Sequence, residues 1–221
     1  MPNIIQIRRA VLKAPAVILA APVVFSLAWT GSASQEASGG ATVNYTSQSF
    51  GAAHPNRVIA VAIGSRISGA SGIVSSVTID GLIATKAIAL DVSTAGLTEI
   101  WYVQHSGAAT SGTISVTFST STLRTGISVY RIITTTPTPV TGASQDSTGT
   151  VTAAISIPTG GGVLAASYSP FGGTSASWAN ATQDYQGNTT STFTSAIATA
   201  NNPSLSATSL RMLLAAASWG P

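Results

Sequence analysis

The stretch 97–133 constrains the fold most, because its apolar residues recur with the period of a β-strand. In its middle, Ile114, Val116 and Phe118 are separated by Ser and Thr residues. Apolar side chains at every second position place one face of a strand in a core and the other in water. The flanking runs 99–104 and 126–133 are rich in β-branched and aromatic residues. The three runs together predict an antiparallel meander, which supplies a scaffold and no chemistry.

Strand patterns continue on both sides of this stretch, and no run has a convincing helical period. Residues 58–63 are apolar at nearly every position, which is typical of a strand buried on both faces. Asp80-Gly81 is a strong turn signal, so residues 73–90 are predicted to form a hairpin. The chain from residue 23 onward then contains eleven or twelve strands, enough for two packed sheets.

Charge is scarce and unevenly placed. Charged residues make up 7% of the chain, and three of its nine Lys and Arg residues are Arg8, Arg9 and Lys13. Six basic and six acidic residues remain after these, so the body is neutral. A neutral body with scattered Lys and Arg argues against a nucleic-acid surface. A surface so poor in charge is weakly protected against association, which suits a protein that is covered by partners.

Residues 134–149 interrupt the strand pattern. Pro137 and Pro139 cannot donate hydrogen bonds inside a sheet, and Ser, Thr and Gly surround them. We interpret this segment as a crossover loop inside one domain, residues 23–221, rather than as a linker. The part that follows has about 70 residues and would form a thin core alone.

Residues 1–22 differ from the rest because they combine basic and apolar residues. Pro15 and Pro22 break the segment, and its apolar run is short for a membrane span. We predict an extended arm that docks on a neighbouring subunit; a signal peptide, a membrane anchor and a strand of the domain are the alternatives. The residues predicted to bind the partner are Ile4, Ile5, Ile7, Arg8, Arg9, Val11, Leu12 and Lys13.

No catalytic or metal-binding pattern stands out. His54 and His105 are predicted to be exposed loop residues, and the six acidic residues are isolated along the chain. A zinc site or a catalytic triad needs His supported by further His, Asp or Glu, and Cys is absent. We therefore predict no catalytic residues, no metal and no cofactor.

Three aromatic residues, Phe171, Trp178 and Tyr185, lie in a loop-rich stretch with Asn, Gln and Asp. Exposed rings could stack on sugars while neighbouring amides bind hydroxyl groups, which would make a glycan contact. The alternative is that Trp178 and Phe171 close the open end of the sandwich.

Several runs carry a resemblance to a known group of proteins, among them NRVIAVAIG at 56–64, SSVTIDGLIA at 75–84 and GTISVTF at 112–118. These runs resemble β-sandwich virion proteins of tailed bacteriophages, over roughly residues 28–219. The resemblance implies a capsid decoration, head fibre or tail-associated protein. The arm at 1–22 has no match in that family, so the resemblance leaves the mode of attachment open.

We therefore expect an all-β chain, an antiparallel β-sandwich of jelly-roll type that carries an N-terminal arm. Its expected function is that of a non-enzymatic structural component of a virion. It would be a homo-oligomer that contacts other virion proteins and, in addition, a host-surface glycan, without nucleic acid and without a membrane span. The alternative is a secreted bacterial adhesin or carbohydrate-binding module, with residues 1–33 as its signal peptide.

Overall fold

The computed structural model describes residues 23–35, 40–67, 73–92, 96–171, 176–188 and 191–221. Within these residues the chain forms antiparallel strands and no helix, so the all-β prediction is confirmed. The described residues accordingly contain no helix that could span a membrane. The predicted arm, residues 1–22, lies outside the described residues. The strands are β1 (Ser26–Gln35), β2 (Thr42–Ser49), β3 (Arg57–Ile67), β4 (Val74–Ile79), β5 (Leu82–Ile83), β6 (Thr85–Val92), β7 (Gly96–Gln104), β8 (Ser111–Phe118), β9 (Thr122–Ile133), β10 (Thr141–Thr152), β11 (Gly162–Ser169), β12 (Ala176–Ala179), β13 (Ala181–Asn188), β14 (Thr192–Ala198) and β15 (Ser204–Trp219).

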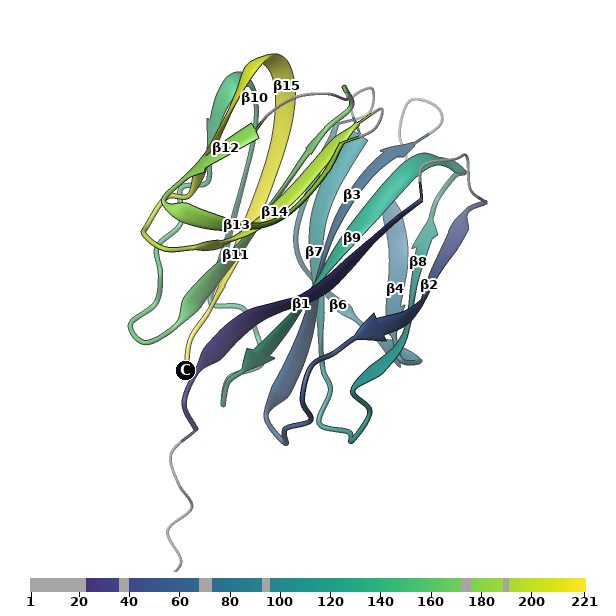
Figure 1. Ribbon diagram of the computed structural model, residues 1–221, viewed down its shortest axis with the longest axis vertical. Coiled ribbons are helices and arrows are strands. Elements are labelled where there is room, and N and C mark those ends of the chain that lie inside the picture. Colours follow the sequence, from purple (N-terminus) through teal and green to yellow (C-terminus); the bar gives the residue numbers. More distant parts are fainter. Residues whose placement is uncertain (1–22, 36–39, 68–72, 93–95, 172–175, 189–190) are drawn as a thin grey trace, which may run out of the picture.

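The described strands form three sheets rather than the two that the sequence predicted, and there are fifteen strands instead of eleven or twelve. A central sheet has the order β1-β9-β3-β7-β6. A four-stranded sheet, β2-β8-β4-β5, covers one of its faces. A six-stranded sheet, β10-β15-β11-β14-β13 with β12 paired to β15, covers the other face (Figure 1).

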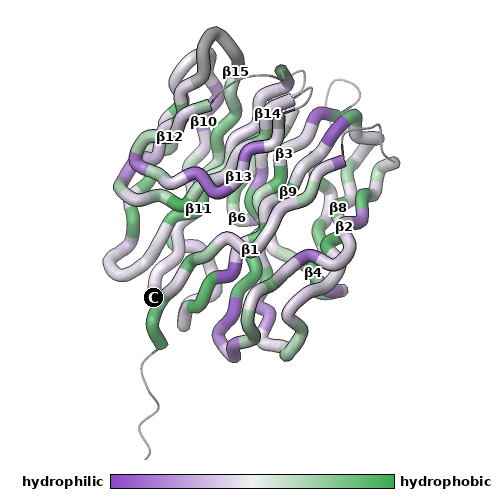
Figure 2. The backbone as a smooth tube through the Cα atoms, in the orientation of Figure 1, coloured by the Kyte–Doolittle hydropathy of each residue, from purple (hydrophilic) through white to green (hydrophobic). Residues whose placement is uncertain are grey.

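Strand β3 is buried on both faces, as its sequence predicted. Ile59, Val61 and Ile63 pack in the core shared with the four-stranded sheet. Val58 and Ala60 pack in the core shared with the six-stranded sheet. In Figure 2 the hydrophobic residues run through the interior strands, whereas hydrophilic segments lie on β13 and near the ends of the sheets.

The predicted meander over 97–133 is wrong. Strands β7 and β9 belong to the central sheet, where both pair with β3, and β8 lies in the four-stranded sheet between β2 and β4. The physical reason is burial: β7 and β9 are apolar on both faces, and only a central layer can bury both. Strand β8 alternates, with Ile114, Val116 and Phe118 buried, so it fits an outer sheet.

The predicted hairpin over 73–90 is half correct. Strands β4 and β5 pair across the Asp80-Gly81 turn, whose residues have φ of 52° and 78°. These left-handed conformations are those of the two-residue hairpin turn that Asp-Gly favours. After Ala84, however, the chain changes sheet, and β6 pairs with β7 in the central sheet.

The predicted crossover at 134–149 is shorter than expected. Residues 134–140 connect the central sheet to the six-stranded sheet, and β10 already begins at Thr141. Strand β10 is an edge strand, and most of its side chains are exposed or half-buried. A strand that buries few of its side chains needs no apolar period, so its sequence resembles a loop.

The six-stranded sheet bends back on itself. Thr141–Thr148 pair with Ser218–Arg211, and after Gly149 (φ 90°) the residues Thr150–Thr152 pair with Ser206–Ser204. Figure 1 shows β10 and β15 turning over at the top. Val151 and Leu205 of the outer limb pack on Val163 and Met212 of the inner limb, which makes a third core.

Candidate assembly surface

One end of the molecule gathers both ends of the described chain, and we call it the arm end. Ser26, near the start of β1, and Arg57, at the start of β3, both pair with Ile133 at the end of β9. Thr134 donates a hydrogen bond to the carbonyl oxygen of Gly220 (2.7 Å). The described chain therefore begins and ends here, and the opposite end is called the far end below.

Arg57 fixes the loops of the arm end from a fully buried position. Its guanidinium donates to the carbonyl oxygens of Gly51 (3.1 Å), His105 (2.9 Å), Gly107 (2.9 Å) and Ala109 (2.7 Å). Burial, followed by the nearby charge of Arg131, lowers its pKa. Only a residue with five N–H donors in a rigid fork can satisfy so many acceptors. Sequence reasoning treated Arg57 as one of several scattered cations and missed this role.

His105 continues the network, and its placement corrects a prediction. It was expected to be exposed, but it is 3% exposed. Nη2 of Arg57 lies 2.8 Å from Nδ1, and because Arg can only donate, Nδ1 must accept. The neutral ring then carries its proton on Nε2, which lies 3.2 Å from Oδ2 of Asp80. Both nitrogens are engaged, so His105 positions the β4–β5 turn and has no nitrogen left for proton transfer to a substrate.

Four of the seven large apolar side chains that are exposed among the described residues lie at the arm end: Val24 (78% exposed), Ile83 (80%), Val140 (58%) and Leu82 (44%). At the far end, Ile73 (46%) and Phe171 (51%) are exposed. The charged groups there are occupied internally: Arg57 and Asp80 as described, and Arg131, whose Nε donates to the carbonyl oxygen of Ala52 (2.9 Å).

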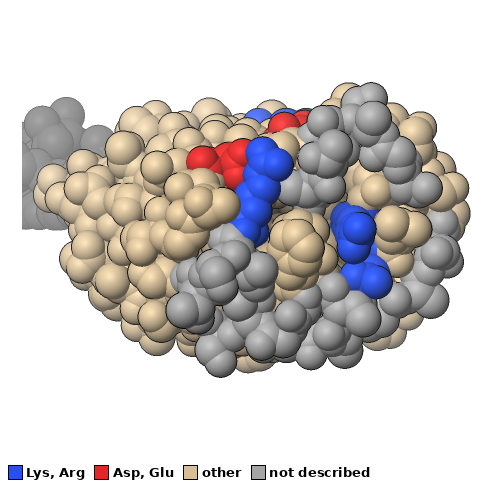
Figure 3. Space-filling model, turned by 90° about the horizontal axis from the view of Figure 1, so that it is seen from above, with Lys and Arg blue, Asp and Glu red and all other residues tan. Residues whose placement is uncertain are grey.

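The far end carries charge instead. Figure 3, which views the molecule from that end, shows both basic (blue) and acidic (red) side chains on its surface. Arg66 pairs in register with Arg124, Asp91 lies opposite Leu97, and Arg211 forms an ion pair with Asp146 (2.5 Å). The two ends of the body therefore differ. The arm end has exposed apolar side chains and few charged groups, and Asp80 and Arg131 there are bonded within the chain. The far end carries more charged groups.

Hollows of useful size also lie at the arm end. A groove of about 450 Å³ runs between the start of β10 and residues 154–158, at the mouth of the bent six-stranded sheet. A shallower hollow of about 290 Å³ is lined by His54, Pro55 and Gly107, among others. His54, expected to be exposed, is half-buried there, and its Nδ1 accepts a hydrogen bond from the backbone N–H of Asn56 (3.1 Å).

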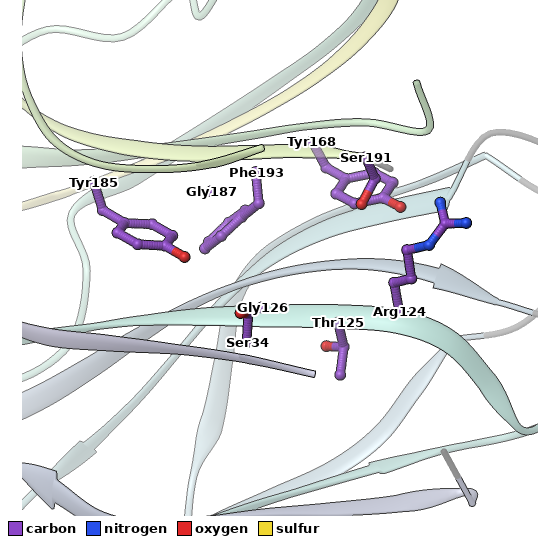
Figure 4. A pocket seen from close by; sticks show the side chains of 9 residues that line it. All are labelled: Ser34, Arg124, Thr125, Gly126, Tyr168, Tyr185, Gly187, Ser191 and Phe193. Atoms are coloured by element: carbon purple, nitrogen blue, oxygen red, sulfur yellow. The ribbon is translucent and has the colours of Figure 1, made fainter. Parts of the chain in front are cut away.

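The hollow near the far end is too small for a ligand. It lies between the central and six-stranded sheets, where Phe193 approaches Gly126, and Tyr168 also lines it (Figure 4). Its volume is about 10 Å³, roughly the space of one water molecule, whereas small-molecule sites are tens of times larger.

The three aromatic residues of the predicted glycan contact do not share a surface. Trp178 packs against the core inside the bent six-stranded sheet, and its Nε1 donates to Oγ1 of Thr194 (3.0 Å). Tyr185 packs on the opposite face of that sheet, beside Phe193. Phe171 is 51% exposed, just after the end of β11.

A buried carboxylate lies between the central and four-stranded sheets. Glu99 is fully buried; its Oε2 accepts from Nε1 of Trp101 (2.5 Å) and lies 3.2 Å from Nζ of Lys86. Its Oε1 accepts from the backbone N–H of Val74 (3.4 Å). Burial raises the pKa of Glu99 to about 7, against the opposing effect of Lys86. Such a pKa suits proton transfer, but its contacts are with the chain's own strands, which it holds together.

A hydroxyl network joins the central sheet to the six-stranded sheet. The hydroxyl oxygen of Tyr130 lies 2.7 Å from Oγ of Ser195 and 3.1 Å from Oδ2 of Asp184. Ser195 in turn donates to Oγ of Ser128 (2.8 Å). Burial raises the pKa of Asp184, and the hydrogen bond from Tyr130 opposes that rise. The described residues contain no group of three His, Asp or Glu side chains that could hold a metal ion.

The predicted arm residues at 4–13 lie outside the described residues, so the site consists of the surface that surrounds their point of departure. Known proteins add no assignment to it. No protein-family model, no curated protein and no solved structure matches this chain.

Proposed function

We propose that this chain is a non-enzymatic structural component of a bacteriophage virion, a capsid decoration, head fibre or tail-associated protein, that assembles through its N-terminal arm. The observation that carries the proposal is the difference in surface character between the two ends of the body. The arm end, where the described chain begins, has most of the exposed apolar side chains, and its few charged groups are bonded within the chain, whereas charge is concentrated at the opposite end. Such a body attaches by its arm end and turns its charged end to water.

The strand order supports the jelly-roll type within this proposal. Strands β1-β9-β3-β7 of the central sheet face β2-β8-β4-β5, so that from β1 to β9 the chain changes sheet at every step except the hairpins β4–β5 and β6–β7. Jelly rolls of eight strands in two sheets are common in viral capsid and lectin domains. Here β6 extends the central sheet, and the six-stranded sheet packs on the face that would otherwise be exposed.

The ionisable residues support a structural role rather than catalysis. Arg57, His105 and Asp80 are bound to one another and to backbone carbonyls, and Glu99 is bound to Lys86 and Trp101. A catalytic group needs an open position beside a substrate. In these clusters the positions are filled by the chain itself, which stabilises loops and strand contacts.

The first test asks whether the chain is part of a particle. Mass spectrometry of purified phage particles should find it, with a sequence that starts at Met1 or Pro2. A mature start near Gln35 in an exported fraction would contradict the proposal and favour the secreted adhesin or carbohydrate-binding module instead.

The second test concerns the arm. A chain that begins at Pro22, and a full-length chain with Ile4, Ile5 and Ile7 changed to Ser, should both fail to join particles in which the native chain is incorporated. Each buried Ile contributes about 1.5–3 kcal/mol, so losing three removes most of a modest interface. Ser75→Ala, at an exposed position of β4, is the control and should be incorporated normally. Normal incorporation of both arm variants would refute the proposal.

A further inference from the structure

The groove at the arm end is elongated between two extended segments of the chain. It runs between the beginning of β10 and the extended segment 154–158, and it has a volume of about 450 Å³. No charged side chain lines it. Ile155, which belongs to the core inside the bent sheet, lines it and is 4% exposed. Its other main lining residues are Val140, Thr141, Ala154, Ser156 and Pro158.

Strand β10 is also the edge strand with the longest regular register. Thr141–Thr148 pair with β15 without interruption, and among the described strands none pairs with the other edge of β10. Strands β1, β2, β6 and β13 are edge strands too, but each has a register shift after at most five paired residues, and β5 has only two residues. Bulges and shortness prevent an edge from accepting another strand. The start of β10 lacks this protection.

We propose that this groove receives the apolar part of the N-terminal arm, residues 3–7, of a neighbouring copy, as an added strand along β10. The inference rests on the proposed function and names the place where the arm docks. In an extended segment Ile5 and Ile7 share one face, which lies against Val140 and Ile155. The backbone of the arm pairs with the open edge of β10, as in other cases of strand addition.

The groove faces away from the side on which its own chain departs. Phe25, close to the arm, packs in the core between the central and six-stranded sheets. Ile155 and the groove belong to the opposite face of the six-stranded sheet. An arm arriving from a neighbouring copy therefore reaches the groove directly, and residues 8–22 can span up to about 50 Å to do so. The three basic residues of the arm follow the apolar segment and stay outside the uncharged groove.

A cysteine cross-link tests the proposal on the full chain, which contains no native Cys. One preparation carries Ile5→Cys and the other Ser156→Cys, an exposed position that lines the groove. Mild oxidation of the mixture, under conditions of assembly, should give a disulfide-linked pair of chains. The control replaces the second preparation by Ser75→Cys, an equally exposed serine on the four-stranded sheet. The groove pair should exceed the control by about tenfold, the effect of roughly 1.4 kcal/mol of binding.

Two results would overturn the proposal: equal yields with Ser156→Cys and Ser75→Cys, or a disulfide that forms only within single chains of the double variant Ile5→Cys/Ser156→Cys. A second measurement is independent of the cross-link. Val140→Asp should weaken assembly about tenfold, and Ile73→Asp, at a similarly exposed residue of the far end, should not. If Val140→Asp lowers the thermal unfolding temperature, Ser156→Arg replaces it; unchanged assembly of that variant also overturns the proposal.

Different results would contradict the proposed function and the assignment of the groove. If the chain that begins at Pro22 still assembles, the arm has no role and the proposed function fails with the groove. If that chain does not assemble but the cysteines of arm and groove do not pair, the arm docks elsewhere and only the groove assignment is wrong.

Discussion

The two sheets that cover the central sheet differ in what they do with their outer faces. The four-stranded sheet buries Val43, Ile114 and Val116 inward and exposes Ser and Thr outward. The six-stranded sheet is apolar on both faces, and it covers its outer face by folding β10 and β15 back over it. A sheet whose strands alternate apolar and polar residues can form the outermost layer of a fold. A sheet that is apolar on both faces must be covered on both.

Their contacts with the central sheet also differ. The four-stranded sheet meets it mainly through Val and Ile side chains, together with the rings of Tyr45, Phe50, Trp101 and Phe118. The six-stranded sheet meets it through alanines and large aromatic rings, which need recesses in the opposite sheet. Gly64 and Gly126, which pair across β3 and β9, form a recess for the ring of Phe193. The first interface tolerates small adjustments, while the second depends on specific shapes.

The largest expected effect is therefore at this recess. A Cβ at Gly64 would overlap with the ring of Phe193, so Gly64→Ala should lower the free energy of unfolding by about 3 kcal/mol, the upper part of the usual range for overpacking. Gly31→Ala is the matched control, because a Cβ there would meet no atom within 4 Å. Urea unfolding followed by fluorescence gives both values.

The same variant tests how tightly the six-stranded sheet is coupled to the rest. Phe193→Leu in the Gly64→Ala background should restore part of the loss, because the smaller side chain vacates the recess. Calorimetry of the native chain should give one transition if residues 23–221 unfold as one unit. A Gly64→Ala chain as stable as the Gly31→Ala chain would show that the recess is not a specific contact.

The second prediction concerns the interface with the four-stranded sheet, where the pKa of Glu99 is raised from 4.5 to about 7. The folded chain then holds the Glu99 proton more tightly than the unfolded chain does. Stability from this group is complete below pH 4.5 and is lost as the pH rises to about 7, by roughly 3 kcal/mol in total. Unfolding in urea at several pH values measures this slope.

Glu99→Gln is the variant that isolates the effect, because its amide oxygen can still accept from Trp101. Its free energy of unfolding should change less between pH 4.5 and 7 than that of the native chain. Some slope of the same sign should remain, since burial also raises the pKa of Asp184. An unchanged slope in Glu99→Gln would mean that Glu99 is not the group that titrates.

A third, smaller effect is expected at the hydroxyl network of the six-stranded sheet. Tyr130→Phe removes a fully buried hydroxyl 2.7 Å from Ser195 and 3.1 Å from Asp184. The loss should be about 1–1.5 kcal/mol, typical of a buried hydrogen bond. Because the bond from Tyr130 holds the pKa of Asp184 down, that pKa should rise further in the variant, which NMR of the carboxyl carbon can follow. A pKa that does not rise would show that the two groups are not bonded in solution.

Sequence patterns located the strands better than the sheets. The two-sided apolar run at 58–63 correctly predicted a central strand, and the alternation at 114–118 correctly predicted one buried face. Residues 97–104 and 126–133 carry the same two-sided pattern, yet their proximity in sequence suggested a meander. Two apolar faces mean that a strand belongs to the central layer, and nearness along the chain says little about which strand lies beside it.

The candidate assembly surface could be predicted from the sequence less well than the strands. Arg57 and His105 are 48 positions apart, and a buried cation looks the same in a sequence as an exposed one. The apolar period also fails for β10, because this edge strand buries few of its side chains. The scarcity of charge and the concentration of basic and apolar residues at 1–13 pointed to assembly, and neither says which surface takes part.

The smallest expected difference compares the two sheets at one type of contact. Thr42 and Thr117 place their hydroxyl oxygens 3.1 Å apart on the exposed face of the four-stranded sheet, and Thr141 and Ser218 place theirs 2.8 Å apart in the six-stranded sheet. Water can replace the first contact, so Thr42→Val should change the free energy of unfolding by less than about 0.5 kcal/mol. Ser218 is fully buried and also accepts from the backbone N–H of Thr141, so Ser218→Ala should cost about 1 kcal/mol. Equal effects in parallel urea titrations would show that the mouth of the bent sheet is as open to water as the outer face of the four-stranded sheet. The two sheets would then differ only in how their cores are packed.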